Sequence, residues 1–324
     1  MKQGEYYYME NLKARFHLPG LTENFKLNMV LITMLENCPQ YFRDGVEIAS
    51  CYGAFTPSIW AGGRVLSSGV NSPDQIKTVI LALNERGIPL RFTFTNPLIT
   101  KEHLGDSYCN MVMQLANNGM NEVIVVSEIL ENYIREMYPN YKITSSTCKR
   151  ITDTDTLNSE LEKNYNLVVV DYDLNNKWDI LEKLPDKEKC EFLLNSSCFP
   201  NCPKRSREYE TVGKNHIQLN KALNEGKTSF KIIDEMNEFF SCPATHRLPF
   251  ETRKLPHHIS PDSIWNEYIP RGFNNFKIEG RGAGRLRVIE DYMYYLIKPE
   301  CRDEAYFMFL HNLERNGVIK IDNV

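Results

Sequence analysis

The stretch NEVIVVSEILENYIREMYPNYKITSS, residues 121–146, contains a strand–helix–strand unit. Residues 121–127 are rich in β-branched side chains, residues 128–138 have a helical pattern, and residues 141–146 are β-rich again. A strand followed by a helix and then by another strand indicates two parallel strands whose helix covers the sheet. The stretch therefore predicts an α/β protein.

The same alternation recurs along the chain. Eight β-rich runs lie at residues 14–18, 45–50, 89–95, 121–127, 141–146, 166–172, 190–197 and 273–280. Helical patterns lie between them at residues 24–38, 73–87, 107–119, 128–138 and 155–165. Eight such strands are the number that closes a (β/α)8 barrel of the TIM type. The alternative is an open doubly wound sheet, but no glycine-rich dinucleotide-binding fingerprint follows the first strand.

The spacing of the strands predicts one TIM-like barrel domain over residues 1–324. About eighty residues separate the seventh strand from the core of the eighth, far more than a crossover needs. We therefore expect an insertion between the last two strands, residues 203–270, that covers the barrel mouth. Residues 285–324 are rich in aromatics and predict C-terminal helices that pack on the barrel.

The composition is that of a soluble globular protein. Hydrophobic residues make up 42% of the 324 residues, charged residues make up 25%, and the net charge is −4, which gives no general attraction for polyanions. We find no signal-like or membrane-spanning apolar run, so we expect a cytoplasmic chain with no membrane partner. Nine cysteines without a secretion signal favour core, ligand or catalytic roles over a disulfide framework.

Three cysteines are expected at the barrel mouth, where the loops after the strands converge. Cys198 and Cys202 follow the seventh strand, and Cys242 lies in the insertion. A Cys-x3-Cys pair on a turn can face one ion or cluster, and four thiolates complete a [4Fe-4S] cluster, whereas three leave one iron open. Cys148 and Cys51 end strands at this mouth and are candidates for a fourth ligand.

Other interpretations of these cysteines remain open. Cys190 begins the seventh strand, at the opposite end of the barrel from the mouth. His246 could complete a Cys3His zinc site with Cys198, Cys202 and Cys242. The thiols could also bind nothing. The Cys-x3-Cys-x2-Cys pattern of radical-SAM barrels is absent from the sequence.

Charged and polar residues at the predicted strand ends are candidates for catalysis and substrate binding. Asp171 and Asp173 follow the sixth strand and could act as general acid–base groups or as caps of the next turn. Asn195 follows the seventh strand and is a candidate substrate-binding residue.

The last strand contributes three charged residues on one face, Lys277, Glu279 and Arg281. Lys277 and Arg281 could hold an anionic substrate while Glu279 moves protons. The alternative is a structural ion-pair network that closes the barrel.

Two further groups are interpreted as exposed. The basic run Lys204, Arg205 and Arg207 predicts a solvated helix face, although it could bind phosphate. The adjacent His257 and His258 lie in a proline-bounded loop and are expected at the surface.

Two motifs resemble a known family. FKIEGR, residues 276–281, after ISPDSIWNEYIPRGFNN resembles the C-terminal signature of the collagenase-like peptidase family U-32, and CFPNCPKRSREY, residues 198–209, resembles its Cys-x3-Cys segment. The resemblance covers roughly residues 14–290. It implies that Cys198 and Cys202 are cluster ligands and that Lys277, Glu279 and Arg281 match the last-strand motif. Where the family usually has a cysteine, this chain has Trp265, so Cys242 is expected to supply that ligand from another loop.

The family's better-understood members are iron–sulfur proteins that take part in oxygen-independent hydroxylation of quinone precursors or RNA bases, and other members are called peptidases. The resemblance therefore implies an iron–sulfur enzyme acting on an RNA base, a small aromatic molecule or a peptide, with an electron-donor protein as a partner. The alternatives are a zinc-dependent peptidase or hydrolase, and a non-enzymatic partner subunit stabilised by a metal.

Overall fold

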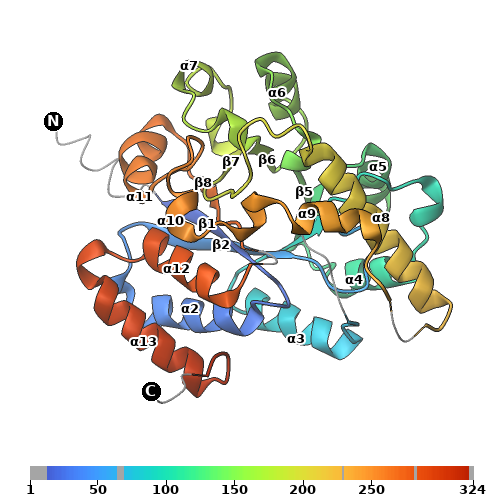
Figure 1. Cartoon of the computed structure of the whole chain (residues 1–324), viewed down its shortest axis with the longest axis horizontal. Coiled ribbons are helices and arrows are strands. Elements are labelled where there is room, and N and C mark those ends of the chain that lie inside the picture. Colours follow the sequence, from blue (N-terminus) through green and yellow to red (C-terminus); the bar gives the residue numbers. More distant parts are fainter. Residues whose placement is uncertain (1–12, 64–68, 228–229, 281–282, 321–324) are drawn as a thin grey trace.

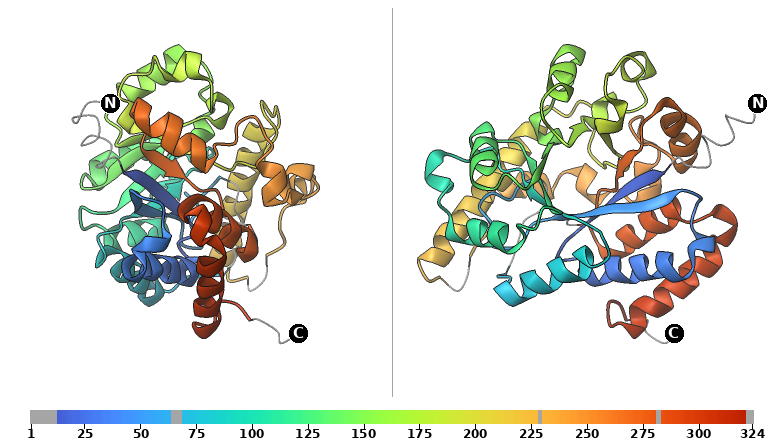
Figure 2. Two further views of the ribbon diagram at one scale, coloured as in Figure 1. Left: turned by 90° about the vertical axis from the view of Figure 1, so that its left-hand side faces the viewer. Right: turned by 180° about the vertical axis from the view of Figure 1, so that it is seen from behind.

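Eight parallel strands form a closed barrel in the computed structural model, which describes residues 13–63, 69–227, 230–280 and 283–320. Each strand pairs with its neighbours in chain order, and β8 pairs with β1 to close the sheet. Helices surround the strands (Figures 1 and 2). The predicted (β/α)8 barrel is confirmed, and the open doubly wound sheet is wrong.

The elements follow the predicted alternation closely. The strands are β1 Ala14–Pro19, β2 Val46–Gly53, β3 Leu90–Phe94, β4 Glu122–Val125, β5 Lys142–Ser145, β6 Leu167–Val170, β7 Cys190–Leu193 and β8 Asn275–Lys277. The helices are α2 Phe25–Asn37, α3 Pro73–Asn84, α4 Ser107–Leu115, α5 Glu128–Met137, α6 Thr154–Leu161, α7 Trp178–Leu181, α8 Arg205–Asn224, α9 Asn237–Phe240, α10 Pro249–Thr252, α11 Pro261–Ser263, α12 Arg285–Leu296 and α13 Arg302–Arg315. Each of the eight strands lies within or beside its predicted run.

The strands form because short runs of β-branched residues are buried on both faces. All four residues of β6 are buried, as are all four of β4. A strand of a parallel barrel faces the interior on one side and the helices on the other, so it needs no polar face. Helix starts are fixed locally: the Ser72 side chain accepts a hydrogen bond from the Gln75 amide at the start of α3, and Pro73 occupies the first helical position.

The insertion between β7 and β8 contains α8 to α11. Helix α8 lies against the loop after β3, because the Asn96 amide donates hydrogen bonds to the carbonyl oxygens of Gly213 (3.2 Å) and Ile59 (2.7 Å). Gly213 permits this close approach, since a Cβ atom there would overlap the Asn96 side chain. The insertion is thereby held over the carboxyl ends of the strands.

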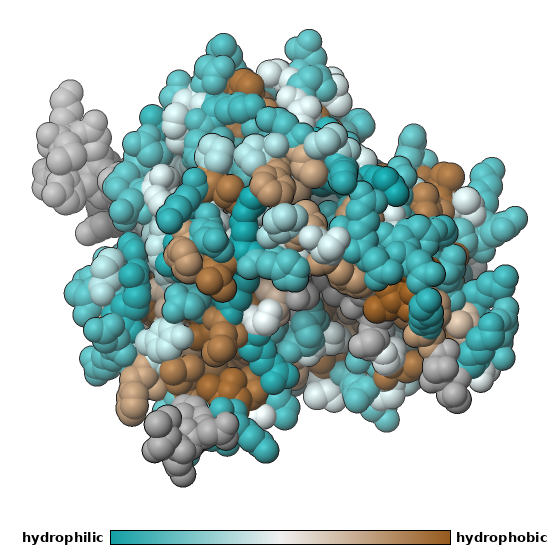
Figure 3. Space-filling view, viewed as in Figure 1, coloured by the Kyte–Doolittle hydropathy of each residue, from teal (hydrophilic) through white to brown (hydrophobic). Residues whose placement is uncertain are grey.

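The C-terminal helices pack on the outside of the barrel. Helix α13 packs against α2, and α12 buries one side that includes Tyr292 and Tyr295. Hydrophilic side chains cover most of the face seen in Figure 3, with smaller hydrophobic areas between them. Within the described residues, no helix has the length and apolar character that a membrane crossing requires.

Candidate functional site

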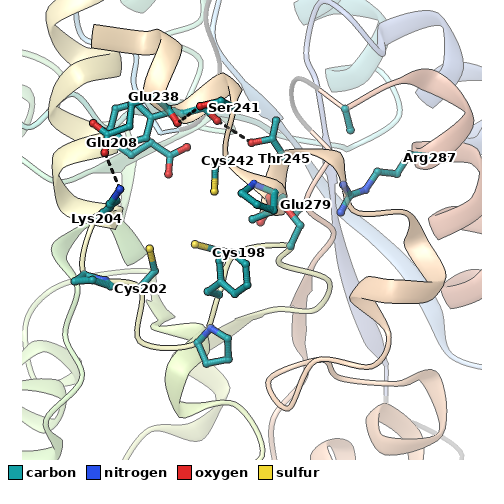
Figure 4. Close-up of a pocket in the computed structure, with 18 of the residues that line it drawn as sticks. Cys198, Cys202, Lys204, Glu208, Glu238, Ser241, Cys242, Thr245, Glu279 and Arg287 are labelled. Carbon is teal, nitrogen blue, oxygen red and sulfur yellow. Dashed lines mark hydrogen bonds and ion pairs between the residues drawn. The ribbon is translucent and has the colours of Figure 1, made fainter.

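A cavity of about 580 Å³ lies at the carboxyl ends of the last strands (Figure 4). Its walls come from the loop after β7, from the insertion around α9, and from the segment after β8. Cys198, Cys202 and Cys242 all line it, and Figure 4 shows their sulfur atoms directed toward a shared space. The structure therefore brings together the three cysteines that the sequence predicts at the mouth.

Hydrogen bonds with residues that follow β5 and β6 hold the loop that carries Cys198 and Cys202. The Asn201 amide donates a hydrogen bond of 2.9 Å to Asp173, and the Cys202 carbonyl accepts one of 3.1 Å from Arg150. Asn201 has a φ of 52°, a left-handed conformation that asparagine tolerates better than most residues. These contacts fix the turn that points both thiols into the cavity.

The thiols do not form a compact single-ion site. Among the residues that the structure describes, no group of three or more histidine, cysteine, aspartate or glutamate side chains is placed to hold a metal ion. His246 does not line the cavity, and its Nε2 lies 2.9 Å from the carbonyl oxygen of Phe240. The Cys3His set is therefore not assembled.

The remaining candidate ligands lie elsewhere. Cys148 lines a second, smaller cavity of about 70 Å³ at the barrel axis. Cys51 and Cys190 are buried, and burial raises the pKa of each thiol to about 12. Neither residue lines the large cavity with Cys198, Cys202 and Cys242. Trp265 donates to the carbonyl of Asp44, before β2, and does not line the cavity.

Asp171 and Asp173 are held by two arginines. Nη2 of the buried Arg205 lies 2.7 Å from both Asp171 oxygens and 2.9 Å from Asp173 Oδ2, while Arg150 lies 3.4 Å and 3.7 Å from the two carboxylates. Asp171 also caps the turn that follows β6 by accepting from the Asp173 amide. The two aspartates thus anchor the start of α8 and the cysteine loop, and their acid–base role stays a prediction.

Two predictions of exposure are wrong. Arg205 is fully buried, because it lies on the inner side of α8 over the Tyr172 ring, whereas Lys204 and Arg207 are exposed and pair with Glu238. His257 is buried as well, with its Nε2 2.9 Å from the Ser196 carbonyl oxygen. The loop around it returns under the cysteine loop instead of extending into solvent.

Asn195 connects the seventh and eighth strands beyond their paired residues. Its amide donates to the Glu279 carbonyl at 2.9 Å and accepts from the Glu279 amide at 2.6 Å. It also donates to Asp291 at 2.8 Å. These bonds fix the backbone of Glu279 and give Asn195 a structural role, and its substrate-binding role stays a prediction.

The charged residues of the last strand divide between the two cavities. Lys277 lines the smaller cavity, and Glu279 lines both, so the two cavities adjoin at Glu279. Arg281 lies outside the described residues. The Lys277 ammonium is 3.4 Å from Glu191 and 4.2 Å from the centre of the Tyr52 ring.

A buried ion-pair network fills the barrel beneath Lys277. Arg91 lies 2.6 Å from Glu191 and 3.2 Å from Glu122, and His17 lies 3.6 Å from Glu191. Burial alone would raise the pKa of Glu191, but Arg91 and Lys277 outweigh it and lower that pKa to about 2. Burial lowers the pKa of His17 to about 3, so its imidazole is neutral near pH 7. Lys277 therefore takes part in an ion-pair network, and its role in substrate binding stays a prediction.

Several residues of the site were missed from the sequence. Asp291 lies on α12, an outer helix, yet it is buried against Asn195, and burial raises its pKa to about 6. Arg287 on the same helix lines the large cavity, and Tyr209 on α8 lines the small one. The polar residues of α8 and α12 gave no local signal, because their position depends on packing between distant segments.

The chain has a structural likeness to a solved structure. No protein-family model and no curated protein matches the chain. The solved structure of the U32 peptidase Mk0906 is similar with a TM-score of 0.49 and 12% identity, over 84% of this chain and 94% of that chain.

Proposed function

We propose that the protein is an iron–sulfur-dependent barrel enzyme that modifies an RNA base, a small aromatic molecule or a peptide, by a reaction such as oxygen-independent hydroxylation. The observation that carries the proposal is the meeting of Cys198, Cys202 and Cys242, from two separate loops, in one cavity at the barrel mouth. Barrel enzymes place their active sites at this end of the strands.

The donor set suits a cluster better than a single ion. Thiolates bound to one tetrahedral zinc ion at about 2.3 Å lie within about 4 Å of one another. The three cysteines line the cavity without forming a group of that kind among the described residues. The ligands of an iron–sulfur cluster bind to separate irons, which permits a wider spacing, and three ligands leave one iron open to a substrate. Such a cluster would supply electron transfer or an open iron.

The chain's own residues would position the substrate and move protons. Glu279 lines both cavities, and Asn195 fixes its backbone, so we assign proton transfer to Glu279. Lys277 and Arg281 are proposed to bind substrate, as the last-strand pattern predicts. Asp171 and Asp173 would hold the cysteine loop through Arg205.

The test is the iron and sulfide content, with the visible spectrum, of the full chain purified without oxygen. About four irons and four sulfides per chain with a brown colour are expected. Replacement of Cys198, Cys202 or Cys242 by Ala should lower the iron content and bleach the colour. Cys301→Ala is the matched control, because Cys301 is a free cysteine at the start of α13 and does not line the cavity.

Other results would select the alternatives. One zinc per chain and no colour would favour a zinc-dependent peptidase or hydrolase, to be checked by chelator-sensitive peptide cleavage in air. A metal whose removal unfolds the chain, with no reaction found, would favour a non-enzymatic partner subunit. Full iron content in the Cys198→Ala variant would refute the proposed ligand set.

A further inference from the structure

The smaller cavity at the barrel axis has polar walls that the ion-pair network does not explain. It holds about 70 Å³ and is bordered by Lys277, Thr95, Thr147 and Glu279. A single water needs only about 10–15 Å³ of such volume, so the cavity can hold a group of a few heavy atoms but not an aromatic ring. Glu279 also borders the larger cavity, which gives the small one a neighbour large enough for the rest of a molecule.

Two hydroxyl groups at this cavity lack a hydrogen-bond partner within the part of the chain that the structure describes. Thr95 is 3% exposed, and its Oγ1 has no partner. Thr147 Oγ1 is buried and equally unpartnered. A buried polar group without a partner costs about 1–3 kcal/mol, so such groups are rare outside sites that receive a ligand or water. Both threonines line the cavity, and rotation about χ1 would turn each hydroxyl toward an oxygen atom placed there, to which it can donate.

Lys277 supplies a cation to the wall of the cavity. The Lys277 ammonium is mostly buried and is held by Glu191 beneath it and by the Tyr52 ring beside it. Glu191 is shared between Lys277 and Arg91, and Arg91 also pairs with Glu122. A cation and hydroxyl donors together favour an oxyanion. The carboxylate of Glu279 at the border disfavours a dianion, because like charges at short range repel.

From this geometry we infer that the small cavity is a subsite for a single carboxylate group of the substrate, contacted by Lys277, Thr95 and Thr147, with the remainder of the substrate extending past Glu279 into the larger cavity. The inference rests on the proposed function only for the statement that the bound molecule is the substrate. It narrows the substrate to a carboxylate-bearing small molecule or peptide and assigns the carboxylate end to the barrel axis.

The test is a titration of the full chain, labelled with ¹³C at the threonine methyl groups, with sodium acetate and with sodium phosphate at matched ionic strength. Acetate should produce a saturable shift of the Thr95 methyl signal, and phosphate should bind more weakly. Thr95→Val keeps the shape but removes the hydroxyl, so the acetate Kd, followed at Thr147, should rise about tenfold. Thr78→Val, on the exposed side of α3, is the matched control and should leave the Kd unchanged.

The outcomes separate this inference from the proposed function. No saturable shift with acetate, an unchanged Kd in Thr95→Val, or tighter binding of phosphate would overturn the carboxylate subsite. Lys277→Met should abolish acetate binding. If the Lys277→Met variant fails to fold, Thr95→Val still tests the inference. Iron content is measured on the same sample. Acetate binding without iron would contradict only the proposed cluster. Iron without acetate binding would contradict only the carboxylate subsite.

Discussion

Arg205 shows how much of the site depends on one side chain. Its guanidinium lies 4.0 Å from the centre of the Tyr172 ring and bonds both Asp171 and Asp173. Removal of one partner from such a buried group leaves an uncompensated charge, which is why these residues cannot vary independently. The loop with Cys198 and Cys202 is attached to Asp173 through the Asn201 amide, so the geometry of these two cysteines depends on this ion pair.

The sequence could not identify Arg205 as a buried residue. It stands between Lys204 and Arg207, which are exposed, and a run of basic residues is usually a solvated helix face. The side chain turns inward because it is the residue of α8 that meets the carboxylates after β6, a contact between segments 34 residues apart. By contrast, Cys198 and Cys202 could be predicted, since both their spacing and their place after a strand are local features.

The buried Asp291 should make the free energy of unfolding depend on pH. Burial raises its folded pKa to about 6, with Glu279 acting in the same direction and Arg287 opposing, whereas an unfolded aspartate titrates near about 3.9. The folded state therefore holds this proton more tightly, and the resulting stability is complete below about pH 4 and is lost as the pH rises through about 6.

We expect the unfolding free energy of the natural chain, minus that of Asp291→Asn, to fall by about 2.5 kcal/mol from pH 4 to pH 8. An asparagine at this position can still accept the hydrogen bond from Asn195 but does not titrate in this range. Urea unfolding at several pH values measures the difference. Asp303→Asn, on the exposed side of α13, should show no such trend, and a flat difference for Asp291→Asn would contradict the assignment.

At the scale of elements, helix α8 covers the mouth of the barrel and contributes to the walls of both cavities. Its Tyr209 lines the small cavity, and its Glu208 lines the large one. The helix is attached through the contact between Gly213 and Asn96, where the backbone of α8 accepts a hydrogen bond from the Asn96 amide. Its position over the mouth therefore depends on the absence of a side chain at residue 213.

Gly213→Ala should destabilise the protein. An alanine in an exposed helix interior is usually about 1 kcal/mol better than glycine, but here the added Cβ would overlap Asn96 Oδ1. Overpacking of this kind typically costs about 1–3 kcal/mol of unfolding free energy, measured by urea denaturation. Gly105→Ala is the matched control, because a Cβ there meets no atom within 4 Å and should change stability little. Equal effects of the two substitutions would show that α8 does not dock as described.

The elements themselves were predictable where the signal is local. The runs at residues 166–172 and 190–197 contain β6 and β7. They could be predicted because a short run of apolar β-branched or aromatic residues between polar residues is typical of a buried strand. The interior of the insertion was less predictable. Its helices α9, α10 and α11 are only three or four residues long, too short for a periodic pattern, and their positions are set by tertiary contacts.

At the scale of the whole molecule, one carboxylate joins strands from across the barrel. Glu191 on β7 lies 2.6 Å from Arg91 on β3, 3.4 Å from Lys277 on β8 and 3.6 Å from His17 on β1. All four side chains are largely removed from solvent. The sequence offered the closing ion-pair network only as an alternative at the last strand, because a pairing across a barrel interior requires knowledge of which strands face one another.

Glu191→Gln should therefore weaken the whole barrel and not a single strand. The substitution keeps the shape but leaves Arg91 and Lys277 without their shared anion, and breaking a buried pair costs about 3–5 kcal/mol. We expect that loss in the unfolding free energy, with the fluorescence and circular dichroism transitions still coincident, because the network connects strands from both halves of the sheet. Glu188→Gln, three residues earlier and exposed, is the control and should cost less than about 1 kcal/mol. Separate transitions in Glu191→Gln would mean that the two halves of the barrel unfold independently. A loss of unfolding free energy no larger than in the control would mean that the network contributes no net stability. The position of Lys277 would then be fixed by packing against Tyr52.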